Sequence, residues 1–285
     1  MAANFWTSSH FEQLLDPEEV DVVHQLDKDK GLTLEEFKLI KMHMTNCVFP
    51  FLCILKLAQS VKVRQRVVAT AVTYMRRVYT RFGSVEASVF LYIVCYESLT
   101  IVFHFSFRKS MSEYDPRLIA PTCLYLASKA EESTVQARLL VFYIKKLNSD
   151  EKYRYEIKEI LEMEMKILEA LNYYLVVFHP YRTLAQMLQD AGINDTSMTQ
   201  LSWGLVNDTY KMDLILIHPP YLIALACMYI ASVHREKDIT TWFEELRVDM
   251  NVVKNISMEI LDFYENYKIS DERINAAFSK LDFKP

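Results

Sequence analysis

Two residues of opposite charge, Lys129 and Glu164, stand where the sequence predicts buried helical surface. Lys129 ends the almost wholly apolar run LYLASK, and Glu164 lies within a helix that begins near Tyr155. At 100° per residue, Glu164 falls in the middle of that helix's apolar stripe. The stripe consists of Ile157, Ile160, Leu161, Leu168 and Leu171. A carboxylate placed there must find a partner or lose several kcal/mol. We therefore expect Lys129 and Glu164 to pair, either as a local polar contact or as hydrogen-bonding groups presented to another protein.

Two further carboxylates, Glu131 and Glu132, follow Lys129 directly. In one interpretation they belong to a solvated loop before the next helix, with Ser133 and Gln136 as a capping box. In the other they form the rim of a surface that contains Lys129. The pattern by itself leaves both interpretations open.

The chain lacks the short motifs of the common enzyme classes. It contains no GxGxxG, no Walker loop, no HExxH and no GxSxG. Its seven histidines have no spacing typical of metal ligands. We therefore expect a protein that is not an enzyme, with no catalytic residue, no metal site and no cofactor.

The composition predicts a helical protein that acts without nucleic acid. Of 285 residues, 51% are hydrophobic, while only four are glycine and eight are proline, too few for the many turns of an all-β protein. The net charge is −5, and direct binding of nucleic acid requires clustered Lys and Arg. Five cysteines without a CxxC motif indicate a reducing compartment. No basic start followed by an apolar core is evident at the N-terminus, so we expect no signal peptide.

An internal repeat organises the chain. LIAPTCLYLASK at 118–129 and LIALACMYIASV at 222–233 share seven of twelve residues. Helices are expected around these anchors near 34–48, 61–80, 116–129, 134–147 and 154–171, and near 181–191, 197–215, 219–234, 240–249 and 251–267. The predicted domains are an N-terminal helical segment (1–33), a first repeat (34–171), a second repeat (172–268) and a C-terminal tail (269–285). Lys129 corresponds to Val233, so core packing shared by the repeats cannot explain the lysine. This difference favours a site in the first repeat.

The tandem five-helix repeat, together with the motifs LASKAEE and ILEMEMKILEAL, resembles the cyclin family, with the first repeat as the cyclin box. The resemblance implies an all-α tandem cyclin fold, two five-helix bundles with an N-terminal helix, and no chemistry of its own. It also implies that Lys129 and Glu164 hydrogen-bond the backbone of a partner cyclin-dependent kinase, with Glu131 and Glu132 at the rim. Trp6 would then pack on the kinase side or anchor the N-terminal segment onto its own first repeat.

Other motifs narrow the resemblance to a transcription-associated member: NFWTSSH, VFHPYRTL and WGLVNDTYKMDLIL. They imply a nuclear protein that activates a Mediator-associated cyclin-dependent kinase and regulates RNA polymerase II, with a role in the cell cycle as a further expectation. Trp203 and Asn207 share a helix face at i and i+4. With Asp208 and Tyr264 they match a groove for another subunit of the Mediator kinase module. The alternative is an amphipathic helix that buries its tryptophan.

Two stretches depart from the family pattern. Residues 82–107 form a surplus segment with no Lys or Arg. It is a membrane segment, an added hydrophobic element, or a translated insert from alternative splicing or a gene-model error. A membrane segment would place Glu97 within the membrane at a cost of about 2.5–3.5 kcal/mol. We favour a translated insert. In the second stretch, 47–55, Pro50 would interrupt the first helix of the box.

These departures leave alternatives for the function. One is an isoform with impaired kinase binding. Another is a tandem initiation factor of the same fold that clamps promoter DNA, which the net charge of −5 disfavours.

Overall fold

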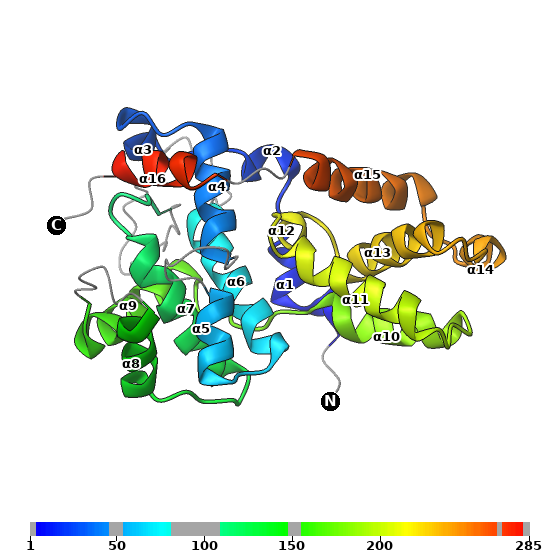
Figure 1. The fold of residues 1–285 in the computed structure, drawn as a ribbon, viewed down its shortest axis with the longest axis horizontal. Coiled ribbons are helices and arrows are strands. Elements are labelled where there is room, and N and C mark those ends of the chain that lie inside the picture. Colours follow the sequence, from blue (N-terminus) through cyan, green and yellow to red (C-terminus); the bar gives the residue numbers. More distant parts are fainter. Residues whose placement is uncertain (1–3, 46–53, 81–108, 148–154, 267–269, 282–285) are drawn as a thin grey trace, which may run out of the picture.

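The computed structural model describes residues 4–45, 54–80, 109–147, 155–266 and 270–281, in which every regular element is a helix. The helices form two units side by side, which correspond to the two predicted repeats (Figure 1). The all-α tandem arrangement is therefore confirmed. The surplus segment 82–107 and residues 47–53 of the second anomalous stretch lie outside the described residues.

The first repeat follows the predicted helix order with one addition. Its helices are α4 (Leu34–Thr45), α5 (Ile54–Val61), α6 (Gln65–Thr80), α7 (Pro116–Ala130), α8 (Ala137–Leu147) and α9 (Ile157–Ala170). The sequence pattern missed α5 and began the next helix four residues early. The physical reason lies at Lys62, whose φ of 56° ends α5 and turns the chain before α6.

The second repeat also follows the predicted helix order with one addition. Its helices are α10 (Pro180–Asp190), α11 (Thr196–Thr209), α12 (Leu214–Ile217), α13 (Pro220–His234), α14 (Thr240–Glu245) and α15 (Met250–Asn266). The helix expected over 197–215 is divided, because α11 ends at Thr209 and α12 begins after Asp213. At this break the Asp213 side chain turns toward the first repeat.

The central helix of each repeat is buried around most of its circumference, as expected. In α7, residues 118–128 are all buried, and α6 and α9 pack against it. In α13, residues 223–228 are buried, and α10, α11 and α15 surround it. Each central helix begins with a proline, Pro116 or Pro220, whose missing N–H costs nothing in the first turn.

A buried ion cluster joins the two repeats. Asp213 accepts hydrogen bonds from Lys41 Nζ at 2.7 Å and from Arg76 Nη1 at 2.6 Å. Both cationic side chains are 1% exposed, and Arg76 also donates to the carbonyl of Tyr210 at 3.0 Å. Burial disfavours the carboxylate, but the two cations outweigh it and hold the pKa of Asp213 well below its ordinary value.

The N-terminal segment crosses from the second repeat to the first as a series of short helical turns. They are η1 (Phe5–Thr7), α1 (Ser9–Glu12), α2 (Pro17–Val20) and α3 (Gln25–Asp29). Near the second repeat, Leu15 N donates to Leu216 O at 2.8 Å. At the first repeat, the buried carboxylate of Asp27 accepts hydrogen bonds from Ser110 and Ser112.

The expected C-terminal tail contains a further helix, α16 (Asp271–Ser279), which returns to the first repeat and packs on α4 (Figure 1). Lys280 Nζ hydrogen-bonds both carboxylate oxygens of Glu36, at 2.7 and 2.8 Å. Ile274 and Ala277, on α16 itself, are buried. Within the described part of the chain, no helix has the length and apolar character needed to cross a membrane.

Candidate functional site

Lys129 and Glu164 meet, as the sequence predicts. The ammonium lies 2.9 Å from each carboxylate oxygen, with Lys129 in the last turn of α7 and Glu164 in the middle of α9. The Glu164 side chain is 10% exposed and that of Lys129 is 40% exposed. Burial disfavours the ammonium, but hydrogen bonds to Glu164 and Tyr125 outweigh it and raise the pKa of Lys129 above its ordinary value. Lys129 is therefore charged, and the pair reaches the surface through this lysine.

The two carboxylates after Lys129 have different positions. Glu131 turns inward, where it accepts a hydrogen bond from Thr70 Oγ1 at 2.7 Å and forms an ion pair with Arg66 Nε at 2.6 Å. Glu132 is exposed and ends α7 with a φ of 52°. Thus only Glu132 lies free at the rim, while Glu131 ties α7 to α6.

Exposed apolar side chains accompany the ion pair. On α9, Leu161 is 42% and Met165 is 53% exposed; they are four residues apart, so they share a helix face, and both lie within one turn of Glu164. Leu161 was expected on the buried stripe, so that placement was wrong. Helix α8, which packs against α9, exposes Leu139 and Phe142 at 41% and 59%. These residues were not predicted, although the run LLVFYI in α8 is too apolar for one buried face.

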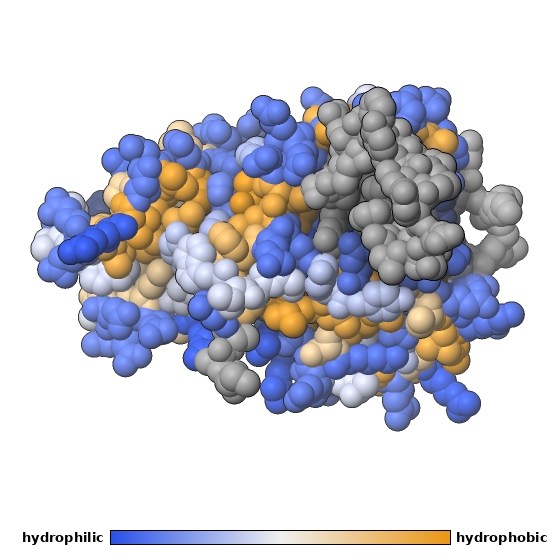
Figure 2. Space-filling model, turned by 180° about the vertical axis from the view of Figure 1, so that it is seen from behind, coloured by the Kyte–Doolittle hydropathy of each residue, from blue (hydrophilic) through white to orange (hydrophobic). Residues whose placement is uncertain are grey.

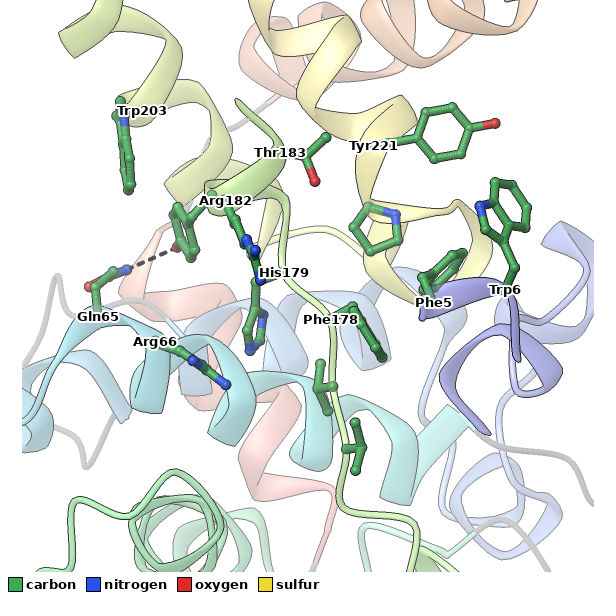
Figure 3. A pocket seen from close by; sticks show the side chains of 14 residues that line it. Phe5, Trp6, Gln65, Arg66, Phe178, His179, Arg182, Thr183, Trp203 and Tyr221 are labelled. Carbon is green, nitrogen blue, oxygen red and sulfur yellow. Dashed lines mark hydrogen bonds between the residues drawn. The ribbon is translucent and has the colours of Figure 1, made fainter. Parts of the chain in front are cut away.

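Trp203 and Asn207 share a face of α11, as predicted. The Trp203 ring stacks on Tyr181 with centroids 5.1 Å apart, and Tyr181 Oη donates to Asn207 Oδ1 at 2.9 Å. Gln65 Nε2 donates to the same oxygen at 3.2 Å. Trp203 therefore lines a cavity of about 820 Å³ instead of being enclosed in the core (Figure 3).

The other two residues of the predicted groove bond to each other. Tyr264 Oη donates to Asp208 Oδ2 at 2.7 Å, and Lys211 Nζ forms an ion pair with Asp208 Oδ1 at 2.6 Å. This contact fastens α15 to the end of α11. Asp208 and Tyr264 are not among the residues that line the cavity beside Trp203.

Trp6 lies at the end of that cavity away from Trp203 (Figure 3). Its ring is 53% exposed and contacts Tyr221, at the start of α13, with centroids 5.6 Å apart. The cavity also contains the cationic side chains Arg66 and Arg182. The structure thus groups Trp6 with the predicted partner groove, and its contact with the kinase stays a prediction.

A chain of hydrogen bonds connects the cavity with the end of α7. His179 lines the cavity, and its Nδ1 lies 2.7 Å from Tyr210 Oη while its Nε2 lies 2.8 Å from Thr70 Oγ1. Because Thr70 donates to Glu131, its oxygen accepts from Nε2–H, and Nδ1 accepts from Tyr210. Burial lowers the pKa of His179 to about 3, so the imidazole is neutral. Each hydrogen bond from Tyr210 through His179 and Thr70 to Glu131 therefore has one direction.

No group of three or more potential metal ligands occurs in the described residues. What the described surface offers is an ion pair with apolar surroundings in one repeat and an aromatic cavity between the repeats. Exposed apolar side chains around a charged pair are typical of protein interfaces, and an aromatic cavity is typical of a binding site.

Two similar helical repeats in tandem, each built around a buried central helix, define the tandem cyclin fold. Residues 19–176 match the family described as the cyclin N-terminal domain, and the chain belongs to the cyclin family. It is 65% identical to cyclin-C1-2 of Arabidopsis thaliana over 286 residues, which cover 100% of both chains. It is 68% identical to cyclin-C1-1 of Oryza sativa subsp. japonica over 274 residues, 96% of this chain and 93% of the rice protein. Within the family, its resemblance is therefore to cyclin C.

A solved structure agrees with this fold. A chain of the CAK complex of Chaetomium thermophilum bound to ATP-γ-S matches with a TM-score of 0.70 at 14% identity, covering 98% of this chain and 87% of the other. As a cyclin, the chain is a regulatory subunit of a cyclin-dependent kinase.

Proposed function

We propose that this cyclin binds and activates the cyclin-dependent kinase of the Mediator kinase module, and thereby regulates transcription by RNA polymerase II in the nucleus. The observation that carries the proposal is the Lys129–Glu164 pair, exposed beside the apolar side chains of α8 and α9 in the first repeat alone. The likeness to cyclin C supports the choice of kinase.

The geometry suits the docking of a kinase helix. The apolar side chains Leu161, Met165 and Phe142 lose water when they are covered, at about 25 cal/mol for each Å². The end of a kinase helix or an adjoining loop then presents backbone groups to the pair. Lys129 donates to a carbonyl, while Glu164 holds the ammonium in position and accepts from an N–H.

Activation follows from differential binding. A cyclin-dependent kinase alone holds its regulatory helix displaced, so that the helix glutamate cannot pair with the lysine that positions the phosphates. The rigid surface of α7 and α9 fits only the inward position of that helix. Because the cyclin binds this conformation more tightly, it shifts the kinase population toward the active arrangement. The cyclin itself contributes no catalytic group.

Replacing Glu164 with alanine tests the proposal. We expect Glu164→Ala to weaken binding of the Mediator-associated kinase by about 2–3 kcal/mol, or roughly 30- to 150-fold, because one partner of a hydrogen-bonded charge pair is lost from the interface. Stability should fall by only about 1 kcal/mol, since the half-exposed Lys129 can regain water. Titration calorimetry and urea unfolding measure the two quantities.

Glu169→Ala is the matched control for that experiment, because Glu169 is an exposed glutamate on the same helix. It should leave both affinity and stability unchanged. If Glu164→Ala reduced stability as much as it reduced affinity, the pair would be a local structural contact and the proposal would fail.

The proposed role of the cavity beside Trp203 has its own test. We propose that the cavity takes a segment of a second subunit of the Mediator kinase module, with an acidic side chain facing Arg182. We expect Trp203→Ala to weaken that subunit's binding about 30-fold, roughly 2 kcal/mol, since buried aromatic anchors dominate such interfaces. Kinase binding, measured on the same sample, should be unchanged. Loss of both partners together would instead indicate a general loss of structure.

A further inference from the structure

The second repeat carries a surface equivalent to the one that surrounds Lys129 and Glu164. The ends of α7 and α13 have the same backbone geometry. Glu132 N donates to Lys129 O at 3.2 Å, and Glu236 N donates to Val233 O at 3.2 Å. Glu132 and Glu236 also have matching φ angles of 52° and 53°. Val233 therefore occupies the structural position of Lys129.

Helices α9 and α15 correspond in the same way. Their buried residues match in pairs that are all the same distance apart along the chain: Ile160 and Val253, Met163 and Ile256, Glu164 and Ser257, Ile167 and Ile260. Ser257 thus replaces Glu164, and its hydroxyl donates within its own helix to Val253 O at 2.8 Å. The ion pair of the first repeat is replaced by a valine and an internally bonded serine.

This replacement leaves an apolar surface that no described residue covers. Val233 is 63% exposed, Met258 is 56% exposed and Leu261 is 42% exposed; we call these three residues the second-repeat patch. Met258 has the position of Met165 in the first repeat, which is 53% exposed. Hydrophobic residues gather between hydrophilic ones over the second repeat, at the left of Figure 2.

A cavity of about 530 Å³ continues the patch past Val233 toward α14. Val233 and Lys254 both line it, and Lys254 lies one turn before Met258 on the same face of α15. Phe243 and Ile239 provide apolar walls. The patch and the cavity therefore form one groove along α15, of a size that accepts the large side chains of a helix.

The charges around this groove are unbalanced. Three carboxylates line the cavity, Glu236, Asp238 and Glu244, against the cations Lys237 and Lys254. Lys237 already pairs with Asp195, at 3.0 Å, which lies outside the cavity. The rim therefore has an excess of negative charge that basic side chains of a partner would meet.

We propose that the second-repeat patch binds an amphipathic helix of a partner protein, with an apolar face over Val233, Met258 and Leu261 and with Lys or Arg on its flank. This site goes beyond kinase binding, since it lies on the other repeat and lacks the ion pair. The partner is recognised by apolar burial and by the acidic rim, without a buried charge couple.

Two synthetic helical peptides test the proposal. Both have leucines at i, i+3, i+4 and i+7, and one has lysine while the other has glutamate on its flank. Fluorescence anisotropy measures their binding to the full chain. We expect the lysine-flanked peptide to bind at least fivefold more tightly than the glutamate-flanked one. Met258→Lys should weaken its binding at least tenfold, because a charge is placed in the apolar contact.

Met165→Lys is the matched control, since Met165 has the equivalent position and nearly equal exposure in the first repeat. It should weaken kinase binding and leave peptide binding unchanged, whereas Met258→Lys should do the reverse. Retained kinase binding also shows that the Met258→Lys protein is folded. Equal effects of the two variants on the peptide, or no saturable binding of either peptide, would overturn the proposal. So would self-association that Met258→Lys abolishes, because a second copy of the chain would then be the occupant.

Discussion

Asp213→Ala should destabilise the protein by about 3–5 kcal/mol, a large part of the total stability of an ordinary domain. The substitution leaves Lys41 and Arg76 buried between the repeats, each 1% exposed, without the carboxylate that pairs with both. The free energy of unfolding from urea titration measures the effect. Lys41→Met in the same chain should restore part of the loss, because one uncompensated charge is removed.

The exposed ion pair Lys38–Asp21 provides the control. Its nitrogen and oxygen are only 2.6 Å apart, yet both side chains are 46% exposed. Asp21→Ala should therefore cost about 0–1 kcal/mol. If the two alanine substitutions had similar effects, burial of the cluster would not govern its contribution to stability.

Mild acid should destabilise the protein strongly. Burial lowers the pKa of His10 and His179 to about 3 and that of His43 to about 4, whereas in the unfolded chain each is near 6.5. Between these values the unfolded chain binds protons that the folded chain does not. This stability is fully present above pH 6.5 and is lost as the pH falls toward 4 for His43 and toward 3 for His10 and His179. At pH 5 each histidine removes about 2 kcal/mol, and the three together about 6 kcal/mol.

Urea unfolding at pH 7.5, 6 and 5 measures this dependence. His10→Gln should make the slope against pH shallower, since glutamine does not titrate and can still accept the hydrogen bond from Phe178 N. His234→Gln is the matched control for this substitution, because His234 is exposed. A stability that stayed constant over this range would contradict the neutral state of the buried histidines.

The fold and the Lys129–Glu164 pair could be predicted from the sequence because each produces a pattern within a short stretch of residues. The two apolar runs 118–129 and 222–233 specify α7 and α13, and Glu164 stood out as a charge on a periodic apolar stripe. A charge that interrupts such a period requires a partner, and the end of the neighbouring buried helix offers Lys129.

Other features produce no pattern within a short stretch of sequence. Asp213 looked like an ordinary charge within one long helix, because its partners Lys41 and Arg76 are 172 and 137 residues away in sequence. Glu131 was expected at a rim, but Arg66 and Thr70 draw it inward. Contacts of this kind depend on how whole helices pack, and no short window of sequence contains both members.

The return of α16 to α4 has a consequence for synthesis on the ribosome. The last helix of the first repeat, α9, ends at Ala170, and α16 begins only at Asp271, about a hundred residues later. At roughly 5–20 residues per second, the α4 surface around His43, on which Phe278 of α16 packs, waits about 5–20 s for its cover. Nascent chains therefore pass through a stage in which this apolar face is open to chaperones.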